Sequence, residues 1–179
     1  MTTPTNRAAR KLLMVEPGSV APDFTLPDGA TGEERTLAEL SAGHDTLLVF
    51  FRGTWCPFCR DQMTVLAENE ERLRRAEVRV VGVVCQGRGS VGRFLAGRPL
   101  PFPLLCDERR TVARTYGTHY WLAWEGAHLS HPALFVLDTH RRVTFAHVGR
   151  SMSDLPVSAI LEKILGSPNA PEPKGDAIR

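Results

Sequence analysis

The 179-residue sequence contains no apolar run that approaches the roughly 20 residues needed by a membrane-spanning helix. Its first ten residues are polar and lack the apolar segment of a signal peptide. These absences predict a cytoplasmic protein that has no membrane partner. The formal net charge is only +2 and the arginines are scattered, so nucleic acid is not indicated as a partner either.

Cysteine and histidine are also scarce. The 4 cysteines are too few and too unevenly spaced for a secreted disulfide scaffold. The 6 histidines are dispersed without the spacing of a metal site, so no metal is predicted. No Gly-rich dinucleotide motif follows a predicted strand, so no cofactor is predicted.

The composition, 42% hydrophobic and 23% charged, is typical of one ordinary globular domain. We expect a flexible segment over residues 1–14, a domain over residues 15–166 and a disordered tail over residues 167–179. The tail is rich in proline and polar residues, which is the basis for separating it from the domain.

The hydrophobic pattern predicts an α/β fold. Apolar runs indicate buried strands over residues 46–51 and 78–85, and a helical period indicates a helix over residues 57–76 between them. The other expected elements are helices over 36–40, 90–95, 108–116 and 155–165, and strands over 104–106, 133–138 and 143–148. Thr36 and Ser90 are the expected caps of the two short helices. Parallel βαβ units followed by a hairpin predict a mixed sheet with helices on both faces.

Cys56 and Cys59 mark the point where the first buried strand passes into its helix. Their spacing places both sulfurs on one face of the first helical turn, and Pro57 is tolerated there. The helix N-terminus is expected to lower the pKa of a thiol, and Cys56 is expected to be the more exposed of the two. Zinc is the alternative, but it needs two further ligands, so redox chemistry is favoured.

The residues around this pair carry a resemblance to a known family. The Trp-Cys-Pro-x-Cys run at residues 55–59 resembles the active site of thioredoxin-like proteins. Residues 18–26, residues 51–59 and the later segments follow the order seen in peroxiredoxins of the alkyl hydroperoxide reductase and thiol-specific antioxidant group. This resemblance spans about residues 15–165 and implies a thioredoxin-like fold.

The sequence departs from the peroxiredoxin motif Pro-x-x-x-Thr/Ser-x-x-Cys. If its Cys is aligned on Cys59, the Thr/Ser position falls on Cys56 and the Pro position on Arg52. The family's later Arg falls on Pro132, and His131 with Pro132 resembles the cis-proline of thioredoxins. Arg52 is the candidate for the missing positive charge.

Which sulfur attacks is left open by the sequence. The resemblance to thioredoxins assigns the attack to Cys56, with Cys59 resolving. The peroxiredoxin alignment assigns it to Cys59, with Cys56 or a distal cysteine resolving, and we favour Cys56 by a small margin. Cys85 and Cys106 each end an apolar segment at the active edge of the predicted sheet, so either could lie beside the pair, although a small buried side chain is the favoured interpretation for each. Cys85 is the stronger of these two candidates.

Several neighbours complete the expected site. Thr54 and Pro57 flank the reactive pair, and Trp55 is expected both to shield the thiolate and to pack in the core. His131 precedes Pro132 opposite the pair in this fold, which makes its neutral ring a candidate donor to a sulfur. A solvent-facing ring is the simpler interpretation. Three aromatic residues in the irregular stretch 118–130 either line a substrate groove or fold back on the core: Tyr120, Trp121 and Trp124.

The resemblance implies a thiol-dependent peroxidase that reduces hydrogen peroxide or alkyl hydroperoxides through a thiolate, a sulfenic acid and a disulfide. An external dithiol such as a thioredoxin-type protein would be the reductant, and a homodimer is what the family implies. Two alternatives use the same cysteines: a general thiol-disulfide oxidoreductase, and a redox sensor whose Cys-x-x-Cys pair switches a surface.

Overall fold

The computed structural model describes residues 15–123 and 126–166. The expected flexible segment 1–14 and tail 167–179 lie outside the described residues, and so does Trp124. The boundaries proposed for the domain therefore stay a prediction.

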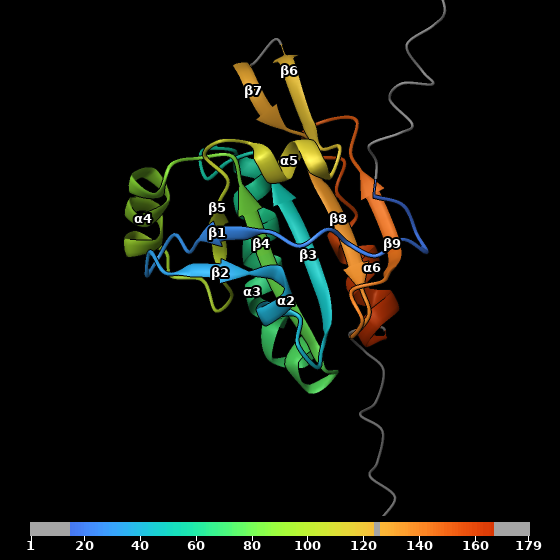
Figure 1. Ribbon diagram of the computed structural model, residues 1–179. Helices are drawn as coiled ribbons and strands as arrows, with labels where there is room; N and C mark the ends of the chain where they lie inside the picture. The colour runs from blue at the N-terminus through green and yellow to red at the C-terminus, as the bar shows by residue number, and fades with distance from the viewer. Residues whose placement is uncertain (1–14, 124–125, 167–179) are drawn as a thin grey trace, which may run out of the picture.

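A five-stranded mixed sheet forms the centre of the molecule, in the order β5-β4-β3-β8-β9 (Figure 1). The strands are β3 (Asp45–Phe51), β4 (Val78–Val84), β5 (Leu104–Cys106), β8 (Ala133–Leu137) and β9 (Val143–Val148). β3, β4 and β5 are parallel, whereas β8 runs antiparallel to both β3 and β9. This arrangement confirms the predicted mixed sheet, and the carboxyl ends of the three parallel strands meet at one edge.

Helices cover both faces of the sheet, as predicted. α3 (Pro57–Arg75), α4 (Arg88–Gly97) and α6 (Val157–Leu165) contribute to one apolar core. α2 (Leu37–Leu40), α5 (Thr111–Thr115) and β1 (Thr25–Pro27) contribute to the core on the other face. β1 pairs antiparallel with β2 (Glu34–Thr36), a short strand that the sequence pattern did not predict.

The helix α3 carries the reactive residues at its start. Cys56 is its N-cap residue and Pro57 occupies its first turn, where the missing amide proton of proline removes no helical hydrogen bond. Its last turn holds three arginines, which complement the negative end of the helix dipole: Arg72, Arg74 and Arg75. The predicted helix over 57–76 is confirmed.

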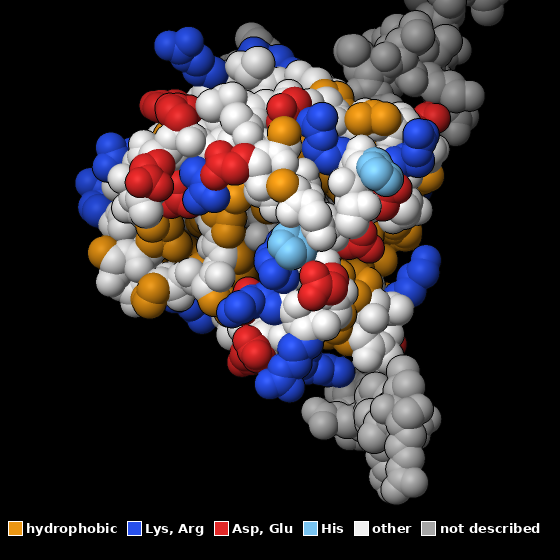
Figure 2. All heavy atoms as spheres, turned by 60° about the horizontal axis from the view of Figure 1, so that its bottom comes forward, with side chains coloured by type: hydrophobic (Ala, Val, Ile, Leu, Met, Phe, Trp, Pro, Cys, Tyr) orange, Lys and Arg blue, Asp and Glu red, His pale blue; other side chains and the backbone are white. Residues whose placement is uncertain are grey.

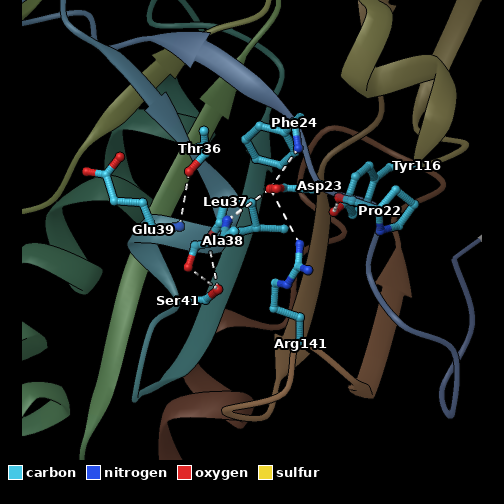
Figure 3. A network of polar contacts seen from close by, with 10 residues as sticks. All are labelled: Pro22, Asp23, Phe24, Thr36, Leu37, Ala38, Glu39, Ser41, Tyr116 and Arg141. Carbon is cyan, nitrogen blue, oxygen red and sulfur yellow. Dashed lines mark hydrogen bonds and ion pairs between the residues drawn. The ribbon is translucent and has the colours of Figure 1, made fainter.

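A polar network ties the N-terminal segment to the body of the molecule (Figure 3). Thr36 Oγ1 accepts the amide of Glu39 at 3.1 Å, and Asp23 Oδ1 accepts the amide of Ala38 at 2.9 Å. Asp23 Oδ1 also lies 3.5 Å from a guanidinium nitrogen of Arg141 in the β8–β9 turn. These contacts satisfy the first amides of α2, which explains how a four-residue helix is maintained.

Two sequence expectations were wrong. Residues expected to be irregular form a hairpin of β6 (His119–Ala123) and β7 (Gly126–Ser130), which projects beyond the edge where β3 ends (Figure 1). These strands pair only with each other, so they need no continuous apolar run of the kind that marks the central strands. α4 begins at Arg88 with Gly87 as N-cap, so Ser90 lies inside the helix and its hydroxyl donates to the carbonyl of Gly87.

The surface carries mixed charge. On the face shown in Figure 2, acidic and basic side chains are interspersed and are not separated by sign. Within the described residues, no helix is both long and apolar enough to cross a membrane. Cytoplasmic localisation stays a prediction.

Candidate active site

The two cysteines of the predicted pair lie at the start of α3, after the loop that follows β3. Cys56 and Cys59 are each only 1% exposed, and both belong to the apolar core beneath the sheet. The expectation that Cys56 is more exposed than Cys59 is therefore wrong, because both cysteine side chains belong to the core, whereas Pro57 and Phe58 between them are exposed. All four cysteines are free thiols in this structure.

The environment of Cys59 opposes ionisation. Burial raises the pKa of this thiol to about 12, and the charge of Cys56 and a hydrogen bond to Cys56 raise it further. Backbone hydrogen bonds from Gly53 and Arg52 act in the opposite direction and lower the pKa. For Cys59, the expected lowering by the helix N-terminus is thus outweighed by loss of solvation.

Three residues of the loop before the pair pack on one another: Arg52, Gly53 and Trp55. The indole of Trp55 lies against Gly53, where an added Cβ would come within 2.3 Å of the ring nitrogen. The buried guanidinium of Arg52 lies 5.4 Å from the centre of the same ring. Trp55 itself is 45% exposed, so the expectation that it packs in the core is wrong. The side chain shields Arg52 and Gly53 from one side instead.

Exposed apolar side chains surround the buried Cys56. Phe58 is 45% exposed, as Trp55 is, and Pro57 between them is also exposed. These three exposed residues, Trp55, Pro57 and Phe58, form an apolar rim that flanks Cys56 in the chain. Such a rim suits an apolar substrate or a protein surface.

Thr54 is buried and both of its backbone groups are bound by side chains. Its amide donates to Gln86 Oε1 at 2.6 Å, and its carbonyl accepts from Arg60 Nε at 2.5 Å. Neither Gln86 nor Arg60 was selected from the sequence. Gln86 had a signal, since a polar residue directly after the buried strand β4 must lie at the edge where β3 also ends.

Cys85 and Cys106 lie on opposite faces of the sheet. Cys106 is paired in register with Val84, and both belong to the same core as the reactive pair. Cys85 follows Val84, so its side chain is expected on the other face, and the charges that affect its pKa come from Asp107, from Arg110 at the start of α5 and from Arg114 within α5. Burial raises the pKa of Cys85 to about 12 and that of Cys106 to about 11. The two thiols are therefore not placed to form a disulfide with each other.

His131 and Pro132 lead into β8. No peptide bond among the described residues is cis, so the resemblance to the cis-proline of thioredoxins is wrong at this point. The amide of His131 donates to the carbonyl of Thr118 at 2.7 Å, and the carbonyl of Pro132 accepts from Gly149 at 2.7 Å. These bonds anchor the segment to its neighbours.

A cavity on the molecule lies away from the cysteine pair. It measures about 560 Å³ and lies beside β1, the end of β5 and α5, with Cys106 and Tyr116 in its wall. Within residues 15–123 and 126–166, no three His, Cys, Asp or Glu side chains are grouped to hold a metal ion. The cysteine pair therefore gains no zinc ligands from the described part of the chain.

Comparison with known proteins gives consistent matches. A family model described as the AhpC/TSA family matches residues 17–146. Peroxiredoxin Bcp of Escherichia coli (strain K12) is 33% identical over 100 residues, which cover 56% of this chain and 63% of that protein. The chloroplastic peroxiredoxin Q of Triticum aestivum is 31% identical over 103 residues, 58% of this chain and 46% of that protein. The chain thus spans less than two thirds of the length of these relatives.

The fold has close counterparts among solved structures. Peroxidoxin BcpB from Mycobacterium tuberculosis superposes with a TM-score of 0.74 at 25% sequence identity, covering 84% of this chain and 94% of that chain. A peroxiredoxin Q variant from Xylella fastidiosa gives the same TM-score of 0.74 at 15% identity. The predicted thioredoxin-like α/β fold is therefore confirmed.

Proposed function

Since this chain belongs to the AhpC/TSA family, we propose that it is a thiol-dependent peroxidase that reduces hydrogen peroxide or alkyl hydroperoxides. The family resemblance predicted from the sequence is thereby confirmed, whereas the significance of the Trp-Cys-Pro-x-Cys variant rests on the residues themselves. The single observation that carries the proposal is a buried pair of free thiols at the start of α3, one contacting the other.

We assign the attack to Cys56. Cys59 holds its proton up to about pH 12, partly because a charge on Cys56 raises the pKa of Cys59. The peroxiredoxin alignment would make Cys59 the nucleophile, but a thiol that stays protonated at neutral pH is a poor one. The hydrogen bond between the two sulfurs places them close enough to form a disulfide.

The proposed cycle has three steps. The Cys56 thiolate attacks one peroxide oxygen, the O–O bond breaks, and the leaving oxygen takes a proton to become water or an alcohol. Cys56 is then a sulfenic acid, and the Cys59 sulfur attacks it to form a disulfide while water leaves. An external dithiol, such as a thioredoxin-type protein, reduces the disulfide by exchange and becomes oxidised itself.

Arg52 is proposed as the positive group of the site. It is fully buried one residue from Gly53, and the position of the family's later Arg is occupied by Pro132. A guanidinium is always charged, so a buried one raises the local positive potential. Thr54, Trp55 and Pro57 then act through the shape of the loop, and Cys85, His131 and Pro132 are proposed as outer neighbours of the reactive pair.

A second candidate is a general thiol-disulfide oxidoreductase. The apolar rim of Trp55, Pro57 and Phe58 favours it, because exposed aromatic side chains around a reactive thiol suit contact with a protein substrate. A homodimer stays an expectation of the family. A redox sensor is distinguished from both enzymes by turnover, since a sensor reacts once and an enzyme continues in the presence of a reductant.

Stopped-flow oxidation of the reduced protein by hydrogen peroxide tests the proposal, with Cys56→Ser and Cys59→Ser as variants. We expect the fast phase in wild type and in Cys59→Ser, and its loss in Cys56→Ser. A fast phase only in Cys56→Ser would instead assign the attack to Cys59. If no protein reacts faster than a free thiol, the peroxidase proposal fails and reduction of a disulfide substrate decides for the oxidoreductase.

A further inference from the structure

We propose that Gln86 is a positioning residue that holds the loop before Cys56 in the shape needed for Cys59 to form the disulfide. The inference rests on the proposed function, because it concerns the resolving step of that cycle. Gln86 follows β4, is only partly exposed and reaches across to the loop that follows β3. It lies 27 residues beyond Cys59 in the chain and is joined to the pair only through Thr54.

The orientation of the Gln86 amide is set by a directed series of hydrogen bonds. Ser90 Oγ donates its proton to the carbonyl of Gly87 at 2.9 Å. The same hydroxyl must then accept from Gln86 Nε2, which lies 3.3 Å away. This leaves Gln86 Oε1 as the acceptor for the amide of Thr54 at 2.6 Å.

The loop needs such an anchor because it contains Gly53. A glycine has more backbone freedom than any other residue, and the backbone amides of Gly53 and Arg52 are the donors to the Cys59 sulfur. Thr54 adjoins Gly53, and its amide and carbonyl are bound by Gln86 and Arg60 from two different elements. Fixing Thr54 on both sides keeps the preceding amides directed at Cys59.

We expect the position of the loop to affect the second step of the cycle, in which the disulfide forms. In the attack on peroxide, Cys59 stays protonated and needs little help from the backbone donors. To attack the Cys56 sulfenic acid, Cys59 must first give up its proton, which leaves with the sulfenic oxygen as water, and the Gly53 and Arg52 amides stabilise the Cys59 thiolate formed in that step. Without the Gln86 acceptor, the buried Thr54 amide loses its partner and the loop relaxes to satisfy it. Disulfide formation should then slow more than sulfenic acid formation does.

The test compares Gln86→Leu, which removes the acceptor at similar size, with Gln86→Glu, which keeps an acceptor oxygen. We expect Gln86→Leu to form the Cys56–Cys59 disulfide roughly tenfold more slowly after one equivalent of hydrogen peroxide. The initial oxidation rate should change less than twofold, so dimedone should trap more sulfenic acid than in wild type. Gln86→Glu should restore most of the disulfide rate.

Gln62→Leu is the matched control, because it makes the same substitution in a glutamine whose amide binds the carbonyl of Leu155 instead. We expect it to leave both steps at the wild-type rate. Equal slowing of both steps in Gln86→Leu, or equal slowing in Gln62→Leu, would show a general loss of structure and overturn the proposal. So would an unchanged ratio of the two rates in Gln86→Leu.

A measurement without peroxide separates this inference from the peroxidase proposal. In a Cys56→Ser background, Cys59 is alkylated by iodoacetamide at pH 8 with and without Gln86→Leu. Loss of the backbone donors lowers the thiolate fraction, so we expect alkylation to slow several-fold. Equal or faster alkylation would overturn the role of Gln86 whether or not the protein reduces peroxides.

Discussion

Replacing Cys85 with alanine should make the protein less sensitive to alkaline pH. Cys85 is 7% exposed, and burial together with the charge of Asp107 raises the pKa of its thiol from 9.0 to about 12. Arg110 and Arg114 act in the opposite direction and do not prevent the increase. The charges that affect the pKa of Cys85 are Asp107, Arg110 and Arg114, so we expect the effect to appear in the stability of the fold.

The direction of this pH effect follows from the number of protons bound by the folded and the unfolded protein. Above about pH 9 the unfolded chain releases the Cys85 proton, whereas the folded protein keeps it up to about pH 12. The stabilisation is therefore complete below pH 9 and is lost between pH 9 and pH 12. At pH 10 the thiol is about 90% ionised in the unfolded chain, which lowers the free energy of unfolding by about 1.4 kcal/mol relative to pH 7.

Urea denaturation followed by circular dichroism at pH 7.5 and pH 10, in the presence of a phosphine reductant, measures this difference. The fall in unfolding free energy between the two pH values should be about 1.4 kcal/mol smaller in Cys85→Ala than in wild type. Val83→Ala, a truncation of a buried side chain in the core facing α5, should lower stability at both pH values without changing the difference. If Cys85→Ala and wild type lose equal stability at pH 10, the thiol is not protonated by burial and the reasoning is refuted.

Two further substitutions test the loop and the N-terminal network. Gly53→Ala should displace the Trp55 ring, because the new methyl group would lie 2.3 Å from its ring nitrogen. We expect a shift of tryptophan fluorescence and a loss of about 1–3 kcal/mol in unfolding free energy. An unchanged fluorescence spectrum would contradict the packing of Trp55 on Gly53. Asp23→Ala should lower the unfolding free energy by about 1 kcal/mol, because the amide of Ala38 loses its acceptor. Asp23→Asn keeps an acceptor oxygen and should lose less, so equal losses in the two variants would assign the effect to the ion pair with Arg141 instead.

The centre of the sheet could be predicted because β3 and β4 are buried on both faces. β3 and β4 read as continuous apolar runs, and the helix α3 between them has a clear helical period. The β6–β7 hairpin and the short β2 could not be predicted, because each pairs at the periphery of the fold with a single partner strand. Local hydrogen bonding between two backbones leaves little trace in the pattern of apolar residues.

Only the residues of the site that lie close together in the sequence could be predicted. The Cys56–Cys59 pair and Arg52 lie within eight residues, so one motif indicates all of them. Gln86 is brought to Thr54 by the parallel pairing of β3 with β4, which places the residues after both strands at one edge. Exposure was misjudged for Cys56 and Trp55, because the depth at which the first turn of a helix packs depends on the core beneath it and not on the motif.

The burial of both sulfurs limits how the site can open. With Cys56 and Cys59 each 1% exposed, a peroxide reaches Cys56 only if neighbouring side chains move, and we expect the exposed rim residues Trp55 and Phe58 to be the ones that do so. The loop behind the pair is bound at Thr54 from two elements, whereas these two aromatic side chains are 45% exposed and are held less firmly. Access should therefore come from rotation of a rim side chain over a fixed loop. Phe58→Ala should then speed oxidation of Cys56 by hydrogen peroxide several-fold in stopped-flow measurements and leave disulfide formation unchanged, whereas a slower oxidation would show that the rim holds the reactive conformation in place.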